Sequence, residues 1–380
     1  MRAQLVTVSL MLPILSPGRR GPLTLFSAAP YGKDSRAAPS PEGPSLPERP
    51  QAVLAMAAEN VPYAFPPDLL ARLRAHLDLD PTLVAHDFTE PRARAALARA
   101  EVLVTGWGCP RLDAAALDGA PKLRAVLHAA GSVKGFTTAE VWRRGILVSS
   151  AADANALPVA EYTLAMILLT GKDVFALREE LRARRGFRYG AILPGLGNHG
   201  RRVGVVGASR VGRRLIELLR PHDLAVALAD PTLDAEEAGR LGVPLLPLDD
   251  LLRTSDVVTL HAPETPATRQ LIGARELALM PTGAVLLNTA RGSLVDQDAL
   301  VEEVRTGRLR AVLDVTDPEP LPTGSPLYDL PGVFVTPHLA GSQGNEVARL
   351  GRVVVEEAAR WAAGAALRHA VDPETLERMA

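Results

Sequence analysis

The chain has 380 residues, of which 47% are hydrophobic and 22% are charged, a balance typical of a globular protein with room for two cores. Its formal net charge is −1, which argues against a nucleic-acid-binding surface, because such surfaces are strongly basic. The single cysteine, Cys109, excludes a disulfide framework within the chain and fits a reducing compartment, so we expect a cytoplasmic protein.

The N-terminal part differs in composition from the rest of the chain. Residues 5–15 are apolar and follow Arg2, as in a signal peptide, but Pro13 interrupts them and no small-residue cleavage site follows. Residues 28–50 are rich in Pro, Ser, Gly and Ala, which bury too little surface to order themselves. We therefore predict that residues 1–49 are a disordered extension, or the product of an upstream start codon. No segment reaches the roughly 20 apolar residues of a membrane-spanning helix, so we expect no membrane partner.

From Gln51 onward, candidate strands alternate with candidate helices, which is typical of a parallel α/β sheet. The strands of this first series are predicted at residues 51–57, 101–105, 123–129 and 145–149, and its helices at 67–76 and 92–98. Residues 156–170 are apolar, as expected of a long helix that passes between two domains. Residues 177–188 are strongly basic, and we interpret them as a solvent-exposed helix face.

A second series of alternating elements begins at Arg202. Its strands are predicted at residues 203–206, 225–229, 243–246, 257–261, 284–287, 310–315 and 333–336. A final helix is predicted at 353–366, with Glu346 and Arg349 before it. Two such series predict two parallel-sheet domains of the α/β class.

The first strand of the second series runs into a glycine-containing turn, VVGASRVG, at residues 205–212. A strand, a tight turn and a helix start suit a pyrophosphate, because the helix N-terminal amides face the anion. Gly207 allows the turn, and Gly212 allows close packing of the helix on the strand. Ser209 replaces the usual middle glycine, so its side chain either crowds the backbone near the phosphate or donates a hydrogen bond to it.

Asp230 stands at the end of the next predicted strand. A carboxylate there accepts hydrogen bonds from an adenosine ribose and repels a 2′-phosphate. The alternative is that Asp230, which precedes Pro231, only starts a turn. Together with the glycine turn, Asp230 favours NAD over NADP.

Three segments follow the last predicted strands and carry candidate catalytic side chains. They read NTARGSLVD at 288–296, LDVTDPEPLP at 313–322 and VFVTPH at 333–338. Ligands bind beyond the carboxyl ends of the strands in open parallel sheets, so Arg291 stands where a ligand is expected. Its guanidinium group suits a bidentate grip on a carboxylate, although a lone arginine is more simply a surface residue in a salt bridge.

Taken together, these three segments resemble the D-isomer-specific 2-hydroxyacid dehydrogenase family. The resemblance extends over residues 50–375 and implies that Arg291, Glu319 and His338 are catalytic. In the segment PEPLP the implied acid is the one directly before Pro320, and not Asp317.

The resemblance also implies the architecture of the chain. It implies two Rossmann-like or flavodoxin-like parallel-sheet domains with a cleft between them. The substrate domain would be discontinuous and comprise residues 50–155 and 339–380. The NAD-binding domain would be the insert of residues 156–338.

The three implied catalytic side chains fit the chemistry of a 2-oxo acid. Arg291 can hold the carboxylate and polarise the carbonyl group, while His338 can protonate the developing alkoxide. Glu319 can hold the other imidazole nitrogen and favour the protonated ring. The chain has eight histidines, and most of them will be ordinary surface or core residues. Only His338 follows a Thr-Pro pair at a strand end.

Further positions match family contacts to NAD. They are Arg210, Val211, His261, Ala262, Pro263, Thr268, Thr289, Ala290 and Asp314, with Arg291 and His338 beside the nicotinamide. For Asp314, the implied role is to accept a hydrogen bond from the carboxamide, and the alternative is to cap a loop. No metal is implied.

Gly131 and Ser132 lie in a loop that matches the family segment whose backbone amides bind the substrate carboxylate. This loop departs from the usual Val-Gly-x-Asp pattern, which leaves the size and charge of the substrate open. Lys134 could meet an anionic tail or simply be solvated. Trp107 is expected in the substrate pocket or in the core. The other matching positions, Asn155 and Glu161, lie at the domain crossing and are expected to be structural.

The resemblance therefore implies an NAD-dependent oxidoreductase that interconverts a small 2-oxo acid of the glyoxylate or hydroxypyruvate type and its D-2-hydroxy acid. Phosphoglycerate dehydrogenase is an alternative, which we disfavour because no long regulatory domain is seen after residue 375. A second alternative is an NAD(H)-sensing interaction protein of the corepressor type. Family members dimerise through cofactor-domain faces, so we expect a homodimer that uses the helix at 156–170.

Overall fold

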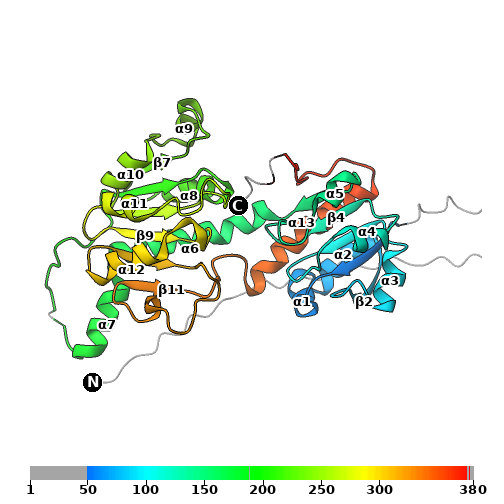
Figure 1. Ribbon diagram of the computed structural model, residues 1–380, viewed down its shortest axis with the longest axis horizontal. Coiled ribbons are helices and arrows are strands. Elements are labelled where there is room, and N and C mark those ends of the chain that lie inside the picture. Colours follow the sequence, from blue (N-terminus) through cyan, green and yellow to red (C-terminus); the bar gives the residue numbers. More distant parts are fainter. Residues whose placement is uncertain (1–48, 188, 375, 377–380) are drawn as a thin grey trace, which may run out of the picture. The chain divides into compact units, whose positions relative to one another are not determined.

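The computed structural model describes residues 49–187, 189–374 and 376. These residues form two parallel sheets with helices on both faces, which confirms the predicted fold class (Figure 1). Except for Arg49, the predicted N-terminal extension lies outside the described residues. Within the described residues, no helix is long and apolar enough to cross a bilayer.

The first sheet has five strands in the order β2-β1-β3-β4-β5, which is the flavodoxin-like order. Its strands are β1 (Gln51–Ala55), β2 (Asp78–Val84), β3 (Val102–Thr105), β4 (Ala125–His128) and β5 (Leu147–Ser150). The helices around it are α1 (Val61–Ala64), α2 (Pro67–His76), α3 (Pro91–Leu97), α4 (Ala114–Asp118), α5 (Ala139–Arg143) and α13 (Val347–Ala362).

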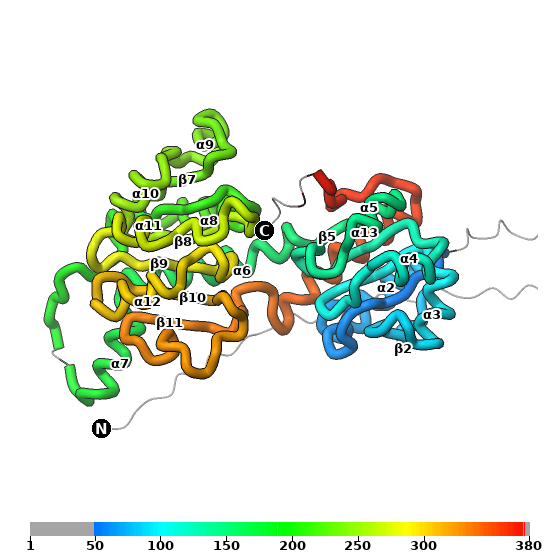
Figure 2. Tube along the Cα trace, in the orientation of Figure 1, coloured from blue at the N-terminus to red at the C-terminus, as the bar shows by residue number. Residues whose placement is uncertain are grey.

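Different helices cover the two faces of this sheet, because side chains alternate along each strand. On β1, Leu54 packs into a core with residues of α2 and α13. Its neighbour Val53 packs on the other face with residues of α3, α4 and α5. Although α13 is the last helix of the described part of the chain, it lies beside α2 (Figure 2).

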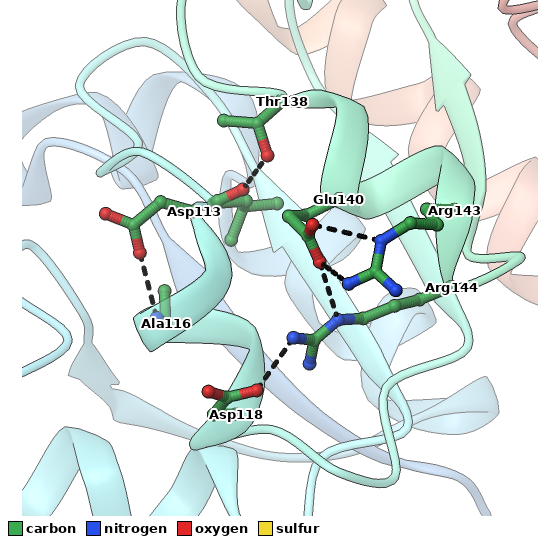
Figure 3. Close-up of polar contacts among 8 residues, drawn as sticks. Asp113, Ala116, Asp118, Thr138, Glu140, Arg143 and Arg144 are labelled. Atoms are coloured by element: carbon green, nitrogen blue, oxygen red, sulfur yellow. Dashed lines mark hydrogen bonds and ion pairs between the residues drawn. The ribbon is translucent and has the colours of Figure 1, made fainter.

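Ion pairs at the surface join α4 to α5 (Figure 3). The guanidinium group of Arg144 lies 2.7 Å from Asp118 and 3.4 Å from Glu140, and Arg143 also pairs with Glu140. The hydrogen bond from Arg143 is the main reason why the pKa of Glu140 is lowered. Exposed pairs of this kind contribute little stability each. They fix the orientation of two short helices and carry no chemistry of their own.

The second sheet has six strands in the order β11-β10-β9-β8-β6-β7. Its strands are β6 (Arg201–Val206), β7 (Leu224–Ala229), β8 (Val257–Leu260), β9 (Val285–Asn288), β10 (Arg310–Leu313) and β11 (Val333–Val335). The helices of this part are α6 (Ala152–Gly171), α7 (Val174–Arg184), α8 (Arg210–Leu219), α9 (Ala235–Leu241), α10 (Leu248–Thr254), α11 (Ala274–Leu279) and α12 (Gln297–Arg305). Residues of α6 and α8 cover one face of the sheet, and residues of α10, α11 and α12 cover the other.

Three elements differ from the sequence predictions. Strand β2 was not predicted, and it contains Pro81, which an edge strand tolerates. The strand predicted at 243–246 is reduced to one bridge between Leu245 and Leu228, because Pro244 has no N–H to extend the pairing. Helix α13 begins six residues before its predicted start, so Arg349 lies inside the helix and not ahead of it.

Candidate active site

The carboxyl ends of β9, β10 and β11 lie at one edge of the second sheet, because the three strands are parallel neighbours. The backbone N–H of Asp314 donates to Asn288 (2.9 Å), and that of Thr336 donates to Leu313 (2.9 Å), so the loops begin level with each other. Arg291 and His338 stand on these loops. The sheet therefore places both predicted residues along the same edge.

His338 and Glu319 are in direct contact. The Nδ1 atom of the ring lies 2.7 Å from the carboxylate oxygen Oε1, and the two side chains are about half exposed. Asp317, the other acid of this segment, instead pairs with Arg269 at 3.1 Å. The structure thus brings Glu319 to His338, as the resemblance implied, and leaves the Nε2 atom of the ring to face a ligand.

Asp314 holds the loop that carries His338. Its buried carboxylate accepts hydrogen bonds from the hydroxyl of Thr336 (2.6 Å) and from the backbone N–H groups of Leu339 and Ala340 (both 2.9 Å). Between these anchors the backbone of His338 adopts a φ of 51°, a left-handed conformation that bulky residues rarely take. Asp314 therefore caps this loop, which is the second of the two roles that the sequence suggested for it.

Two adjacent residues of α6 contact the loops at this edge. The hydroxyl groups of Tyr162 and Thr336 lie 2.7 Å apart, and those of Thr163 and Thr289 lie 3.0 Å apart. Burial raises the pKa of Tyr162, so the phenol stays protonated. The sequence analysis did not single out Tyr162 or Thr163. Helix α6 also carries Asp153, Asn155 and Glu161, so a tyrosine and a threonine within it give no distinctive signal in the sequence.

Arg291 lies in a turn that Asn288 stabilises. The side chain of Asn288 donates to the carbonyl group of Arg291 (2.7 Å) and accepts from the N–H of Ala290 (3.0 Å). A Cβ atom on Gly292 would lie only 2.0 Å from the backbone of Thr316, so only glycine fits at that position. Among the described residues, no carboxylate pairs with the guanidinium group of Arg291, which donates one hydrogen bond, to the carbonyl of Ala290 (2.6 Å).

A cavity of about 670 Å³ lies beside His338. Its other lining residues are Asn60, Tyr63, Trp107, Asn155, Gly341, Ser342, Gln343, Gly344 and Val347. The structure therefore brings Trp107 to the same pocket as His338. It does not place Arg291, Gly131 or Ser132 among the lining residues. Asn60 and Tyr63 were missed by the sequence analysis, because nothing in their local pattern marks them.

The predicted substrate loop rests on a buried histidine. The Nδ1 atom of His128 lies 2.9 Å from the hydroxyl of Thr105, and the ring also bonds the backbone of Ser132. Burial lowers the pKa of His128 to about 3, so the ring is neutral. A Cβ atom on Gly131 would lie 3.3 Å from the amide of Asn155, which leaves little room for a side chain. The loop of Gly131 and Ser132 thus lies directly behind Asn155, which lines the cavity, although neither residue is itself part of the lining.

Both predicted glycines of the turn after β6 are required. Gly207 has a φ of 98°, and a Cβ atom there would lie 2.5 Å from the backbone nitrogen of Ala262. A Cβ atom on Gly212 would lie 2.1 Å from the carbonyl oxygen of Gly207. Ser209 caps α8, and its hydroxyl accepts a hydrogen bond from the N–H of Gly212 at 3.4 Å. The hydroxyl keeps its own hydrogen while it accepts this bond, so donation to a phosphate stays a prediction.

Asp230 both stabilises its own loop and borders a large cavity. Its carboxylate accepts from the N–H of Ala208 (2.7 Å) and from the N–H and hydroxyl of Thr232 (2.8 and 2.6 Å). The adjoining cavity has a volume of about 880 Å³. Of the predicted cofactor residues, its lining includes Ser209, Asp230, Ala262, Pro263 and Thr268. Asp230 can therefore stabilise its turn and at the same time face a ligand in the cavity.

Other predicted cofactor residues lie around this turn. Arg210 pairs with Asp153, and the side chain of Val211 packs against the core. His261 is buried and its pKa is lowered to about 3, while its Nε2 atom lies 2.9 Å from the hydroxyl of Thr259. Its Nδ1 atom is buried without a hydrogen-bond partner. The glycine cradle, the N-terminus of α8 and this orphaned nitrogen fit a dinucleotide phosphate group.

Comparison with known proteins also indicates a dinucleotide-binding domain. A family model described as D-isomer specific 2-hydroxyacid dehydrogenase, NAD binding domain, matches residues 164–340. Over 283 residues the chain is 35% identical to a D-3-phosphoglycerate dehydrogenase of Mycobacterium bovis, covering 74% of this chain and 52% of that protein. Over 274 residues it is 31% identical to a glyoxylate reductase of Aeropyrum pernix, covering 70% of this chain and 82% of that protein.

A solved structure shares the fold over nearly the whole described region. It is a D-isomer specific 2-hydroxyacid dehydrogenase from Xanthobacter autotrophicus Py2 in complex with NADPH and MES. The TM-score is 0.68 and the sequence identity is 27%, with 87% of this chain and 100% of that chain covered. The chain spans about half the length of the phosphoglycerate dehydrogenase that it matches.

Proposed function

Because the chain belongs to the D-isomer-specific 2-hydroxyacid dehydrogenase family, we propose that it interconverts a 2-oxo acid and its D-2-hydroxy acid with NAD(H). The observation that carries the proposal is the 2.7 Å contact between His338 and Glu319, on the same sheet edge as an arginine without a carboxylate partner among the described residues. These are the three groups that reduction of a 2-oxo acid requires.

Each side chain has a separate task in this proposal. Arg291 binds the substrate carboxylate and draws electron density from the carbonyl oxygen. His338 gives the proton at Nε2 to the developing alkoxide, because its Nδ1 atom already faces Glu319. Glu319 orients the ring and stabilises its charged form, and Asp314 holds the loop.

The nicotinamide cofactor supplies the hydride when it is bound. We propose that Gly207, Ser209, Arg210 and Gly212 hold its pyrophosphate at the N-terminus of α8. The backbone of Val211 contributes to the same helix start. Asp230 would bind the ribose, which favours NAD over NADP.

The remaining predicted contacts fill the two ends of the cofactor site. His261, Ala262, Pro263 and Thr268 would border the adenosine, since three of these four residues line the 880 Å³ cavity. Thr289, Ala290 and Asp314 would border the nicotinamide at the sheet edge. Gly131 and Ser132 would offer backbone amides to the substrate carboxylate.

Two substrate groups have specific support. Glyoxylate and hydroxypyruvate are suggested by the resemblance and by the similarity to a glyoxylate reductase. Phosphoglycerate is suggested by the 35% identity to phosphoglycerate dehydrogenases. Of these two groups we favour the first over phosphoglycerate, because no lysine or arginine lines the cavity beside His338 to pair with a phosphate.

The proposal is tested by following oxidation of NADH by the purified full chain with a panel of 2-oxo acids. We expect steady turnover, a product of D configuration, and loss of turnover in His338→Ala. Tight binding of NADH without turnover of any acid would overturn the proposal and favour a sensing protein of the corepressor type.

We also infer the organisation of the whole molecule. The substrate domain would comprise residues 50–155 and 339–380, and the NAD-binding domain residues 156–338, since α13 packs on the first sheet. We propose a cytoplasmic homodimer. Its support is α7, which buries none of its residues, and the exposed apolar side chains of Leu181, Phe187 and Ile192 on and after it. A monomeric mass in light scattering at micromolar concentration would exclude the dimer.

A further inference from the structure

The cavity beside His338 has no cation among its lining side chains apart from His338 itself. The remaining lining residues carry amides, hydroxyl groups, aromatic rings or no polar group at all. A phosphorylated tail would bring about two negative charges into this space, and buried charges need a paired cation. Apart from His338, which the proposed reaction uses as its proton donor, the lining therefore offers such a tail no paired cation.

Two aromatic side chains form part of this lining. Trp107 is 40% exposed and Tyr63 is 56% exposed, which is a large apolar surface to leave in contact with water. A planar apolar group in contact with these rings would cover that surface. Aromatic pairs in offset or edge-to-face contact gain further free energy, about 0.5–1.5 kcal/mol.

The backbone behind Trp107 is fixed. Its carbonyl oxygen accepts hydrogen bonds from the N–H of Ala57 (2.8 Å) and from the side-chain amide of Asn60 (3.4 Å). The next residue, Gly108, has a φ of 83°, and a Cβ atom there would lie 2.8 Å from Ala57. The backbone of this loop is therefore packed tightly from behind, and it sets the position of Trp107 at the cavity, where the residue is 40% exposed.

The volume of the cavity favours a substrate with a tail. At about 670 Å³ it has the size of sites that enclose ligands much larger than a two-carbon acid. Glyoxylate has no side chain with which to reach Trp107 or Tyr63.

We infer that the pocket beside His338 selects 2-oxo acids with an uncharged aromatic tail, and that Trp107 and Tyr63 are its specificity-determining residues. This inference rests on the proposed function, since it names the substrate class for the same site. It predicts that phosphorylated 2-oxo acids are poor substrates despite the similarity to phosphoglycerate dehydrogenases.

The test uses two matched substrate pairs with the full chain and NADH. Phenylpyruvate and pyruvate differ only in the ring, and 3-phosphohydroxypyruvate and hydroxypyruvate differ only in the phosphate. We expect kcat/KM to be at least about tenfold higher for phenylpyruvate than for pyruvate. We expect it to be at least about tenfold lower for the phosphorylated acid than for hydroxypyruvate.

Variants assign the effect to the two aromatic residues. Trp107→Ala and Tyr63→Ala should each lower the ratio of phenylpyruvate to pyruvate efficiency by several-fold. Tyr63 is more than half exposed, so its variant is expected to fold even if Trp107→Ala does not. Tyr189→Ala is the matched control, because Tyr189 is an exposed aromatic residue outside the pocket lining, and the ratio should stay at the wild-type value.

Three outcomes would overturn the inference. Preference for the phosphorylated acid would mean that a cation reaches the pocket. Arg349 of α13 is the candidate, since one of its guanidinium nitrogens is buried without a hydrogen-bond partner. Equal efficiency with phenylpyruvate and pyruvate would mean that the rings do not contact the tail. No turnover of any of the four acids would overturn the proposed function, and this inference with it.

Discussion

Tyr162 donates a hydrogen bond to Thr336 across the 2.7 Å that separate their hydroxyl groups. The direction follows from Asp314, because a carboxylate can only accept and Thr336 has one hydrogen, which it gives to Asp314. The chain from Tyr162 through Thr336 to Asp314 thus ends at the backbone that brackets His338.

We predict that Tyr162→Phe lowers kcat by about two- to tenfold, the effect of one lost hydrogen bond on a positioned proton donor. The KM for NADH should change little. Thr336→Ser keeps the hydroxyl group and should retain most of the activity, whereas Thr336→Val should behave like Tyr162→Phe. Steady-state kinetics of the three variants measure kcat. An equal loss of kcat in Thr336→Ser and Thr336→Val would count against a role for the hydrogen-bond chain from Tyr162 to Asp314.

Arg291→Ala should remove several kcal/mol of transition-state stabilisation, because grip on the carboxylate and polarisation of the carbonyl group are lost together. The quantity to measure is kcat/KM for the best 2-oxo acid. Arg240→Ala is a suitable control, since Arg240 is an exposed residue paired only with Glu236. A value of kcat/KM near that of the wild type in Arg291→Ala would refute the role of this residue.

His338→Ala should lower kcat/KM by about 10²- to 10⁴-fold, because the proton donor is lost. Glu319 lies 2.7 Å from the ring and orients it. Glu319→Gln keeps an oxygen that can accept from Nδ1, so it should retain more activity than Glu319→Ala. Steady-state kinetics of the three variants measure the effect. A value of kcat/KM near that of the wild type in Glu319→Ala would show that another group orients the histidine.

Asp230→Asn should raise the efficiency with NADPH relative to NADH. The substitution removes the charge that repels a 2′-phosphate but keeps an oxygen that can accept from the N–H of Ala208. The turn should therefore survive, which a thermal unfolding curve can verify. The ratio of kcat/KM for the two cofactors is the readout, and an unchanged ratio would reduce Asp230 to a turn residue.

The buried His128 makes stability depend on pH. Its pKa in the folded protein is about 3, below the value of about 6.5 for the unfolded chain. The stabilisation that the neutral ring of His128 gives to the folded state is therefore fully present above about pH 6.5. It is lost as the pH falls from there towards 3. Between pH 7 and pH 5 the loss should be about 2 kcal/mol.

In His128→Gln the free energy of unfolding should decline less over this pH interval than in the wild type. Urea titrations at the two pH values measure the difference. Thr105→Val removes the hydroxyl group beside the ring but no titratable group, so it should keep the decline of the wild type. Identical declines in His128→Gln and in the wild type would show that the ring is not kept neutral by burial.

The sheets could be predicted from sequence because buried parallel strands are continuous apolar runs. Strand β2 could not, since its buried and exposed residues alternate with aspartates and a proline at the sheet edge. The start of α13 was placed too late because Val347 stands among polar residues, and only its packing against the core of the first sheet reveals that it belongs to the helix.

Part of the candidate active site could also be predicted from the sequence, and part could not. Glu319 and His338 stand in local segments whose pattern is distinctive, and the structure brings them into contact. Tyr162, Tyr63 and Asn60 are far from those segments in the chain. Their proximity to the site arises from tertiary packing, which no local pattern encodes.

Tyr162 and Thr163 occupy consecutive positions of α6, yet one contacts the loop before His338 and the other the loop before Arg291. The register of a single helix therefore sets the spacing of two loops that are far apart in sequence. Recombination between relatives has to respect this coupling. A hybrid that joined this substrate domain to a foreign cofactor domain would keep matched loops only if the crossover fell ahead of Tyr162, within the first turns of α6.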